Sequence, residues 1–168
     1  METIRTNRIK PVNAFEESNL ELLDLIINQF QLDVEGDHGI KHWRRVFEIG
    51  NYLTKETKAD IKIVNLFAYL HDSRREDESD DLEHGKRASV FVRELYDRKL
   101  LSISKEQLDK LLFACEHHNN PNIKSEDITI QTCWDADMLD LWRIGVMPDK
   151  HFLNTDFAKQ EKVINLWR

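Results

Sequence analysis

Residues 61–72 read IKIVNLFAYLHD, a nearly all-apolar segment that ends directly in His71 and Asp72. A helix that is apolar on almost every side is buried on almost every side, and Asp60 is a suitable N-cap for a helix that begins here. A carboxylate at the buried end of such a helix requires a cation or hydrogen-bond donors nearby. The segment therefore predicts a central helix that ends in a polar site.

The sequence on both sides of this segment repeats the 3.6-residue hydrophobic spacing of amphipathic helices. Ser104 and Gln107 form a capping-box pattern, and Pro121, Gly145 and Pro148 mark helix ends. Besides residues 61–70, the predicted helices cover about residues 20–30, 38–54, 84–95, 104–115, 130–144 and 156–167. We therefore predict an all-α fold, a compact single-domain bundle of six or seven helices with its core at about residues 38–145, an N-terminal extension at 1–17 and a C-terminal extension at 146–168.

The composition excludes several classes of protein. Only 5 Gly and 3 Pro in 168 residues argue against a turn-rich β fold. The 31 Asp+Glu outnumber the 24 Lys+Arg, so no nucleic-acid polymer is expected as a partner. No apolar run approaches the about 20 residues that span a bilayer, and residues 1–11 do not form a secretory signal. We expect a cytoplasmic protein without a membrane partner, in which Cys115 and Cys133 are small buried hydrophobes.

The positions of the histidines within their helices predict which of them point inward. His42, His84 and His118 each share a face with the apolar residues of their own helix, whereas His117 is turned about 100° away from that face. With His71, four separate helices direct an imidazole toward the interior. Imidazole is the commonest metal ligand in proteins, so this convergence favours a metal site.

Two aspartates of the segment 130–144 differ in their predicted orientation. Asp137 lies near the middle of the apolar stripe, whereas Asp135 points away from it. A buried carboxylate is costly unless a cation or hydrogen-bond donors compensate it. Metal coordination explains Asp137 and the converging imidazoles together, and we expect Asp135 to support a ligand from behind.

Any single histidine on an apolar face has a simpler interpretation as a hydrogen-bonded core residue. Convergence from four helices weakens that interpretation. His38 lies one turn before His42 and either caps its helix or supports a ligand from behind. His151, near Pro148 and outside any apolar stripe, is predicted to be exposed to solvent.

The ordered set His42, His71-Asp72 and Asp137, each part on its own predicted helix, resembles the H…HD…D signature of the HD superfamily. That superfamily consists of metal-dependent phosphohydrolases with an all-α fold. The resemblance covers about residues 38–145 and is closest to stand-alone bacterial HD-domain proteins. It implies an HD-domain-like fold for this chain.

The resemblance also implies roles for individual residues. It makes His42, His71, Asp72 and Asp137 the ligands of a first divalent metal. His84 and His118 stand where HD branches with an enlarged site carry further histidines, which bind a second metal or contact the substrate phosphate. Mixed imidazole and carboxylate ligands suit Mn, Fe, Co, Ni, Zn or Mg, with one or two ions per chain. The expected catalytic residues are Asp72, which aligns the attacking water, and His84 and His118, which steady the phosphate or protonate the leaving oxygen.

The function that follows is a metal-dependent phosphohydrolase, either a phosphatase or a phosphodiesterase. It would hydrolyse a small phosphoester, such as a nucleotide or related metabolite, by a metal-activated water. The alternatives are a non-catalytic HD-fold module that binds a ligand or regulates, and a purely structural helical protein. No GYP segment follows His117-His118, so the cyclic-dinucleotide branch of the superfamily is not supported.

Cationic and aromatic residues near the site allow two further expectations. Arg74 or Arg75, which follow the HD pair, is expected to bind the substrate phosphate, and the alternative is a salt bridge to the acidic residues of the segment 76–83. Two interpretations fit the aromatic residues Trp142, Phe152, Phe157 and Trp167. They form either a surface patch that mediates a homodimer or part of the core.

Overall fold

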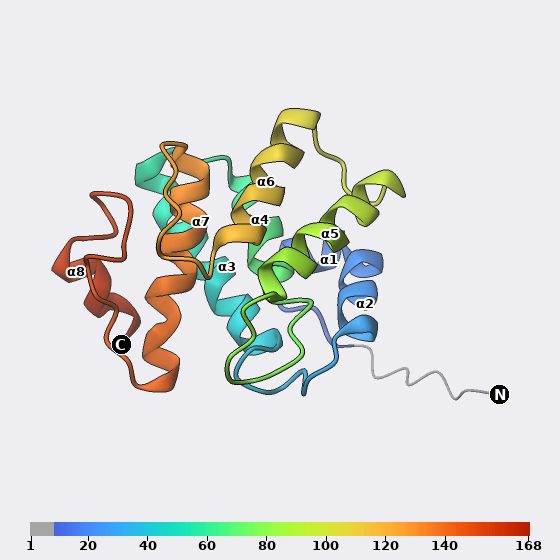
Figure 1. Cartoon of the computed structure of the whole chain (residues 1–168), viewed down its shortest axis with the longest axis horizontal. Coiled ribbons are helices and arrows are strands. Elements are labelled where there is room, and N and C mark those ends of the chain that lie inside the picture. The colour runs from blue at the N-terminus through green and yellow to red at the C-terminus, as the bar shows by residue number, and fades with distance from the viewer. Residues whose placement is uncertain (1–8) are drawn as a thin grey trace.

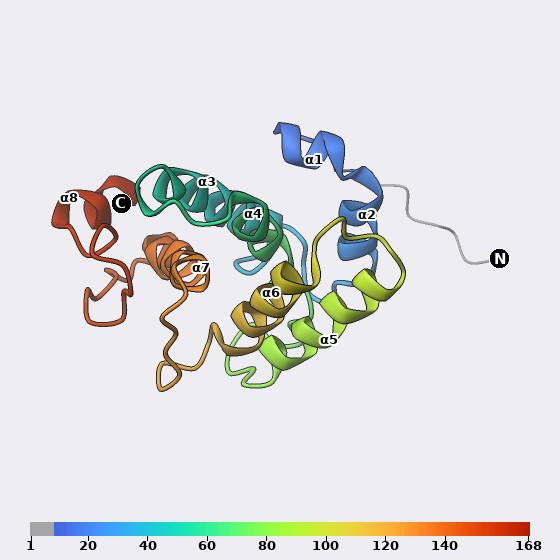
Figure 2. The ribbon, with the colours of Figure 1, turned by 90° about the horizontal axis from the view of Figure 1, so that it is seen from above.

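Helix α4 (Ile61–Leu70) is the centre of the fold, as its apolar sequence predicts. In this computed structural model, which describes residues 9–168, α4 packs against α3 (Ile40–Thr57), α6 (Lys105–His117) and α7 (Ile128–Leu139). Asp60 caps α4, as predicted, because its side chain accepts a hydrogen bond from the backbone N–H of Lys62. Figure 1 shows the surrounding helices, and Figure 2 shows α3, α4 and α6 side by side from above.

The described part of the chain is entirely helical where it is regular. Helix α5 (His84–Asp97) packs along α6, and α2 (Leu20–Gln29) contacts α4. The short elements are α1 (Ala14–Ser18), α8 (Glu161–Ile164) and the 3₁₀ helices η1 (Asp140–Ile144) and η2 (Asn165–Trp167). Residues 9–168 form eight α-helices, more than the predicted six or seven, because the count includes the two short helices α1 and α8. The predicted all-α, single-domain bundle is confirmed. None of the described helices is both long and apolar enough to cross a membrane.

Three predictions about the helices are corrected, namely the start of the second helix, the helix of the tail and the N-terminal extension. The second helix begins at Ile40 rather than at His38, because residues 34–39 form turns in which Ile40 N–H donates to Val34 and Gly39 caps the helix. The tail forms only α8 and η2 instead of a helix over 156–167. Helix α1 lies inside the segment that we predicted as an extension, and it packs against α2.

Two glycines allow the helices that carry the polar site to approach each other closely. At Gly50, a Cβ atom would lie 2.4 Å from Val64 Cγ1, so the backbone of α3 packs directly against a side chain of α4. At Gly85, a Cβ atom would lie 2.7 Å from the carbonyl oxygens of Cys115 and Glu116. Any side chain at Gly85 would push the start of α5 away from the end of α6.

A buried ion pair fixes α1 to the core. The Glu16 carboxylate is fully buried and accepts hydrogen bonds from Arg44 Nε at 2.7 Å and Arg44 Nη2 at 2.9 Å. The Tyr69 hydroxyl donates to the same carboxylate at 2.8 Å, and the Val12 N–H at 2.9 Å. Because Arg44 belongs to α3 and Tyr69 to α4, this carboxylate joins three helices.

Glu16→Ala is expected to lower the free energy of unfolding by about 2–4 kcal/mol, because Arg44 and Tyr69 lose their shared acceptor. Burial disfavours the charged form, but the donors of Arg44, Tyr69 and Val12 outweigh it and lower the pKa of Glu16. The stabilisation is therefore complete above the ordinary glutamate pKa of about 4.3 and is lost as the pH falls through the lower folded value. Urea unfolding at several pH values measures both effects. The control is Glu17→Ala, since Glu17 is exposed, and an equal effect of both variants would contradict the prediction.

Candidate metal centre

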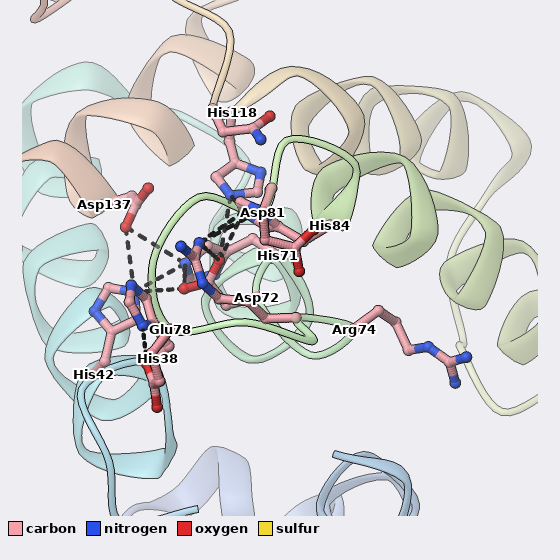
Figure 3. A network of polar contacts seen from close by, with 12 residues as sticks. His38, His42, His71, Asp72, Arg74, Glu78, Asp81, His84, His118 and Asp137 are labelled. Carbon is pink, nitrogen blue, oxygen red and sulfur yellow. Dashed lines mark hydrogen bonds and ion pairs between the residues drawn. The ribbon is translucent and has the colours of Figure 1, made fainter. Parts of the chain in front are cut away.

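The six predicted site residues meet at one buried point (Figure 3). His42 comes from the first turn of α3, and His71 and Asp72 directly follow α4. His84 is the first residue of α5, His118 directly follows α6, and Asp137 lies in α7. The exposed fraction of the side chain is at most 5% in all of them except Asp137, for which it is 25%.

One set of ligand atoms lies between α3, α4 and α7. The Nε2 atoms of His42 and His71 are 3.1 Å apart, and Asp137 Oδ1 lies 3.3 and 3.4 Å from them. Asp72 Oδ2 lies 3.4 Å from His42 Nε2 and 3.7 Å from His71 Nε2. The four residues that the resemblance implied as ligands of a first metal therefore lie together.

A second set of atoms lies around the other oxygen of the same aspartate. Asp72 Oδ1 lies 3.1 Å from His84 Nε2 and 3.4 Å from His118 Nε2, and these two nitrogen atoms are 2.9 Å apart. Asp72 thus presents one carboxylate oxygen to each pair of histidines. Such a carboxylate is placed to serve two sites at once.

The Nδ1 atoms of three of these imidazoles are bound to main-chain oxygens. His71 Nδ1 donates to the carbonyl of Phe67 at 3.0 Å, and His118 Nδ1 donates to that of Cys115 at 2.7 Å. His84 Nδ1 contacts the carbonyl of Asp81. A carbonyl only accepts hydrogen bonds, so it fixes the proton on Nδ1 and leaves the Nε2 lone pair directed at the cluster.

His42 differs from the other three, because its Nδ1 donates to a carboxylate. Asp140 Oδ2 accepts this hydrogen bond at 2.6 Å, and Arg45 Nε donates to the other oxygen, Oδ1, at 2.7 Å. The side chain of Asp140 is 4% exposed. A carboxylate behind a histidine fixes the ring and makes it a stronger metal ligand.

The arrangement of the imidazole Nε2 atoms and carboxylate oxygens fits a bound cation. A neutral imidazole that carries its proton on Nδ1 can only accept at Nε2. Two such acceptors repel each other at the 3.1 Å that separates His42 from His71 and at the 2.9 Å that separates His84 from His118. A shared proton or a metal ion between them removes the repulsion. The groups His42–His71–Asp137 and His71–Asp72–His118 could each hold a metal ion.

The charges within the cluster are strongly coupled. Burial disfavours ionisation of Asp72 and Asp137, but the electrostatic interaction with His71 and hydrogen bonds from the neighbouring imidazoles hold the pKa of both carboxyls well below the usual range. Burial likewise opposes a charge on His42, but the carboxylates of Asp137, Asp140 and Asp72 outweigh it and raise the pKa of His42 to about 10. The two ligand carboxylates are therefore anionic and attract a cation.

A cavity of about 410 Å³ opens onto the cluster from solvent. Asp72, His84, His118 and Asp137 line its polar end. The remaining lining includes a group of apolar side chains from α7, from η1 and from the segments that follow α6 and η1, namely Ile123, Trp134, Met138, Leu141 and Phe152. The volume is typical of a site for a small molecule.

The two predicted substrate-binding arginines have different positions. Arg75 lines the cavity, and its Nη1 lies 3.4 Å from the His84 ring and 3.9 Å from Asp72 Oδ1. Arg74 extends away from the cluster in Figure 3, because its Nη1 donates to Gln29 Oε1 and its guanidinium lies over Phe91. The structure therefore brings Arg75 and not Arg74 to the site.

Arg75 also holds the acidic segment 76–83, though by main-chain oxygens instead of the salt bridges that we considered. Its Nε donates to the carbonyl of Asp77 and its Nη2 to that of Ser79. His38 lines the cavity and contacts Glu78 of the same segment, so this histidine lies at the edge of the site and caps no helix. Burial lowers the pKa of His38 against the effect of Glu78.

The expectation for Asp135 is corrected. Asp135 is fully buried, and its carboxylate accepts hydrogen bonds from the backbone and side chains of Asn154 and Thr155 rather than from a ligand histidine. The residues after η1 cover the face of α7 that we predicted to be outward. Asp135 therefore anchors the C-terminal segment.

Asp140 is the functional residue that sequence reasoning missed. It follows Asp137 by three residues, which places both on one face of a helix, and this spacing was the available signal. His118 is the inward histidine, as predicted, while His117 lines the cavity and packs against Phe113 at 4.5 Å between ring centroids.

The remaining predictions concern residues outside the cluster. His151 is exposed and Cys115 and Cys133 are buried, as predicted. Phe157 and Trp167 pack on Tyr52, and Trp142 Nε1 donates to the carbonyl of Ile164, so core packing accounts for these aromatic residues. Phe152 is half exposed at the cavity.

A solved structure shares this fold. The chain is similar to a crystal structure of a predicted HD superfamily hydrolase from an uncultured Thermotogales bacterium, with a TM-score of 0.68 and 21% sequence identity over 92% of this chain and 90% of that chain. No family model matches the sequence, and no curated protein matches it. The HD-like fold that the sequence predicts is confirmed, together with a buried His/Asp cluster that could hold a metal ion.

Asp140→Asn is expected to weaken metal binding about 10–100-fold, because the amide keeps the shape of Asp140 but removes the charge behind His42. Calorimetric titration of the metal-free protein with Mn²⁺ measures the dissociation constant. The matched control is Asp135→Asn, a buried aspartate that contacts no ligand, which should change thermal stability and leave the Mn²⁺ affinity within about two-fold of the wild type. Equal Mn²⁺ affinity of Asp140→Asn and the wild type would contradict the prediction.

Proposed function

We propose that this chain is a metal-dependent phosphohydrolase that acts on a small phosphoester, such as a nucleotide or related metabolite. The observation that supports it best is the set of six converging ligand side chains at the closed end of a solvent-accessible cavity. The HD-like fold adds support, because it is shared with a predicted hydrolase. Within the described residues, every position of the H…HD…D set keeps a side chain able to bind metal.

His42, His71, Asp72 and Asp137 would hold the first divalent ion, one of Mn, Fe, Co, Ni, Zn or Mg. His84 and His118, together with Asp72, would hold a second ion or contact the phosphate. When bound, a divalent cation lowers the pKa of water from 15.7 toward about 7 and polarises a phosphoryl oxygen.

The residues of the chain would supply orientation and proton transfer. An oxygen of the Asp72 carboxylate accepts a hydrogen bond from the attacking water and aligns it with the phosphorus atom. The water oxygen joins phosphorus, the ester P–O bond breaks, and the leaving oxygen takes a proton. With a single metal, His118 or His84 would donate that proton from Nε2.

Arg75 would bind the phosphate. Two of its guanidinium nitrogens are occupied by the carbonyls of Asp77 and Ser79, which orient the third, Nη1, toward His84 and Asp72. A guanidinium held in this way pairs with a phosphate oxygen at little cost in side-chain entropy.

Asp72→Asn is expected to reduce hydrolysis to below about 1% of the wild type and to lower metal content, because it removes charge at the oxygen atoms shared by both sets of histidines. The measurement combines metal analysis with release of phosphate from a panel of nucleotides and sugar phosphates. Circular dichroism establishes that the variant folds. The double variant His71→Ala/Asp72→Ala provides a second test, and unchanged metal content and hydrolysis in it would refute the enzyme function.

Arg75→Ala is expected to lower kcat/KM about 10–100-fold, the value of one charged hydrogen bond to phosphate, and to weaken inhibition by inorganic phosphate similarly. Arg74→Ala is the matched control, because the neighbouring guanidinium faces Gln29 and Phe91. Steady-state kinetics and phosphate inhibition are measured for both variants. A loss of the same size in both, or in Arg74→Ala alone, would argue against the assignment.

A further inference from the structure

Helix α7, which carries Asp137, and the 3₁₀ helix η1, which follows it directly, carry much of the apolar wall of the cavity. Trp134, Met138 and Leu141 are three residues before, one after and four after Asp137, and all three line the cavity. A helix rises about 5.4 Å per turn, so these side chains begin within about one turn of the ligand carboxylate. A molecule whose phosphate reaches the cluster therefore has its organic part beside them.

The apolar wall is held in place before any ligand binds. The indole Nε1 of Trp134 donates to the carbonyl of Ala114 at 3.0 Å, and its ring lies near Phe113, with the ring centroids 6.1 Å apart. Ile123 adds to the wall from the segment between α6 and α7, and Phe152 adds to it from the segment after η1. An apolar wall that contains a hydrogen-bonded indole suits the face of an aromatic ligand.

Three asparagines beside this wall each use one end of their side-chain amide in a contact with the protein. The amide nitrogen of Asn119 donates to the carbonyl of Leu82, and that of Asn154 donates to Asp135. The side-chain oxygen of Asn120 accepts from the N–H of Asn122. Against the apolar side chains themselves, a hydroxyl-rich group would find no hydrogen-bond partner, at a cost in binding free energy. An apolar ring would instead gain from leaving water.

We infer that the substrate is a phosphoester whose organic part carries a flat aromatic ring, a nucleobase or an aryl group, and that Trp134, Met138 and Leu141 select for the face of this ring. The inference rests on the proposed function, whose phosphate site it extends. It excludes simple sugar phosphates and glycerol phosphates as preferred substrates.

The test compares ligands that differ only in the ring. Adenosine 5′-monophosphate and ribose 5-phosphate share a primary phosphate and a ribose, and benzylphosphonate and methylphosphonate are a non-hydrolysable pair. For the Mn²⁺-loaded protein, we expect the ring-bearing member of at least one pair to bind at least about 10-fold more tightly, by calorimetry and by kcat/KM where hydrolysis occurs. The pair with the larger ratio of affinities between its two members shows whether the preferred ring is a nucleobase or an aryl group.

Met138→Asn is expected to reduce this ratio to less than about 3-fold, because it places a polar group within the wall. Met147→Asn is the matched control, since Met147 is 64% exposed and does not line the cavity, and it should keep the wild-type ratio. Leu141→Asn is a second variant, so that the test does not depend on one variant folding.

The outcomes separate the two proposals. Hydrolysis of phosphoesters with ratios near one in both pairs would overturn the selection for a ring and leave the phosphohydrolase intact. Ring-dependent binding without hydrolysis of any phosphoester would refute the phosphohydrolase and support a binding module with the same preference. An unchanged ratio in folded Met138→Asn and Leu141→Asn would overturn the assignment of the wall.

Discussion

The Asp72 carboxylate is the group on which the rest of the structure depends. It is almost completely buried, and each of its oxygens faces a different pair of imidazoles. A carboxylate in that position is costly unless cationic groups or donors surround it. The imidazoles come from four helices, so satisfying this one side chain requires α3, α4, α5 and α6 to converge at one end. The glycines at positions 50 and 85 permit that convergence, because each stands where a side chain would separate two of these helices.

The inward histidines and the fold class could be predicted from local sequence. His42, His84, His118 and Asp137 each lie on the apolar stripe of one helix, and helical phase is a property of neighbours in sequence. The central helix could be predicted equally well, because residues 61–70 are apolar on almost every side of a helix. These features required no knowledge of which helix packs on which.

The features that sequence missed depend on distant segments. Asp135 lies opposite the stripe of α7 and was read as outward, yet Asn154 and Thr155 return to cover it. Arg74 and Arg75 are adjacent and of the same type, and Arg74 extends away from the site because Gln29 of α2 and Phe91 of α5 contact its guanidinium. Asp140 lies beyond the end of α7, so its contact with His42 depends on how α3 and α7 cross. Local periodicity predicts on which face of its helix a residue lies, but it does not predict which distant segment packs on that face.

The charges around the cluster indicate how a phosphate could be admitted to an acidic site. One divalent ion, if bound as proposed, would balance the charges of Asp72 and Asp137, while Arg45 already pairs with Asp140. Arg75 is then a positive charge at the cavity that the two ligand carboxylates no longer neutralise. Without the ion, the same two carboxylates would repel a phosphate at this distance. On the proposed function, metal binding and phosphate binding would therefore be coupled through Asp72, which among residues 9–168 is the carboxylate that lies within 4 Å of both the histidines and Arg75.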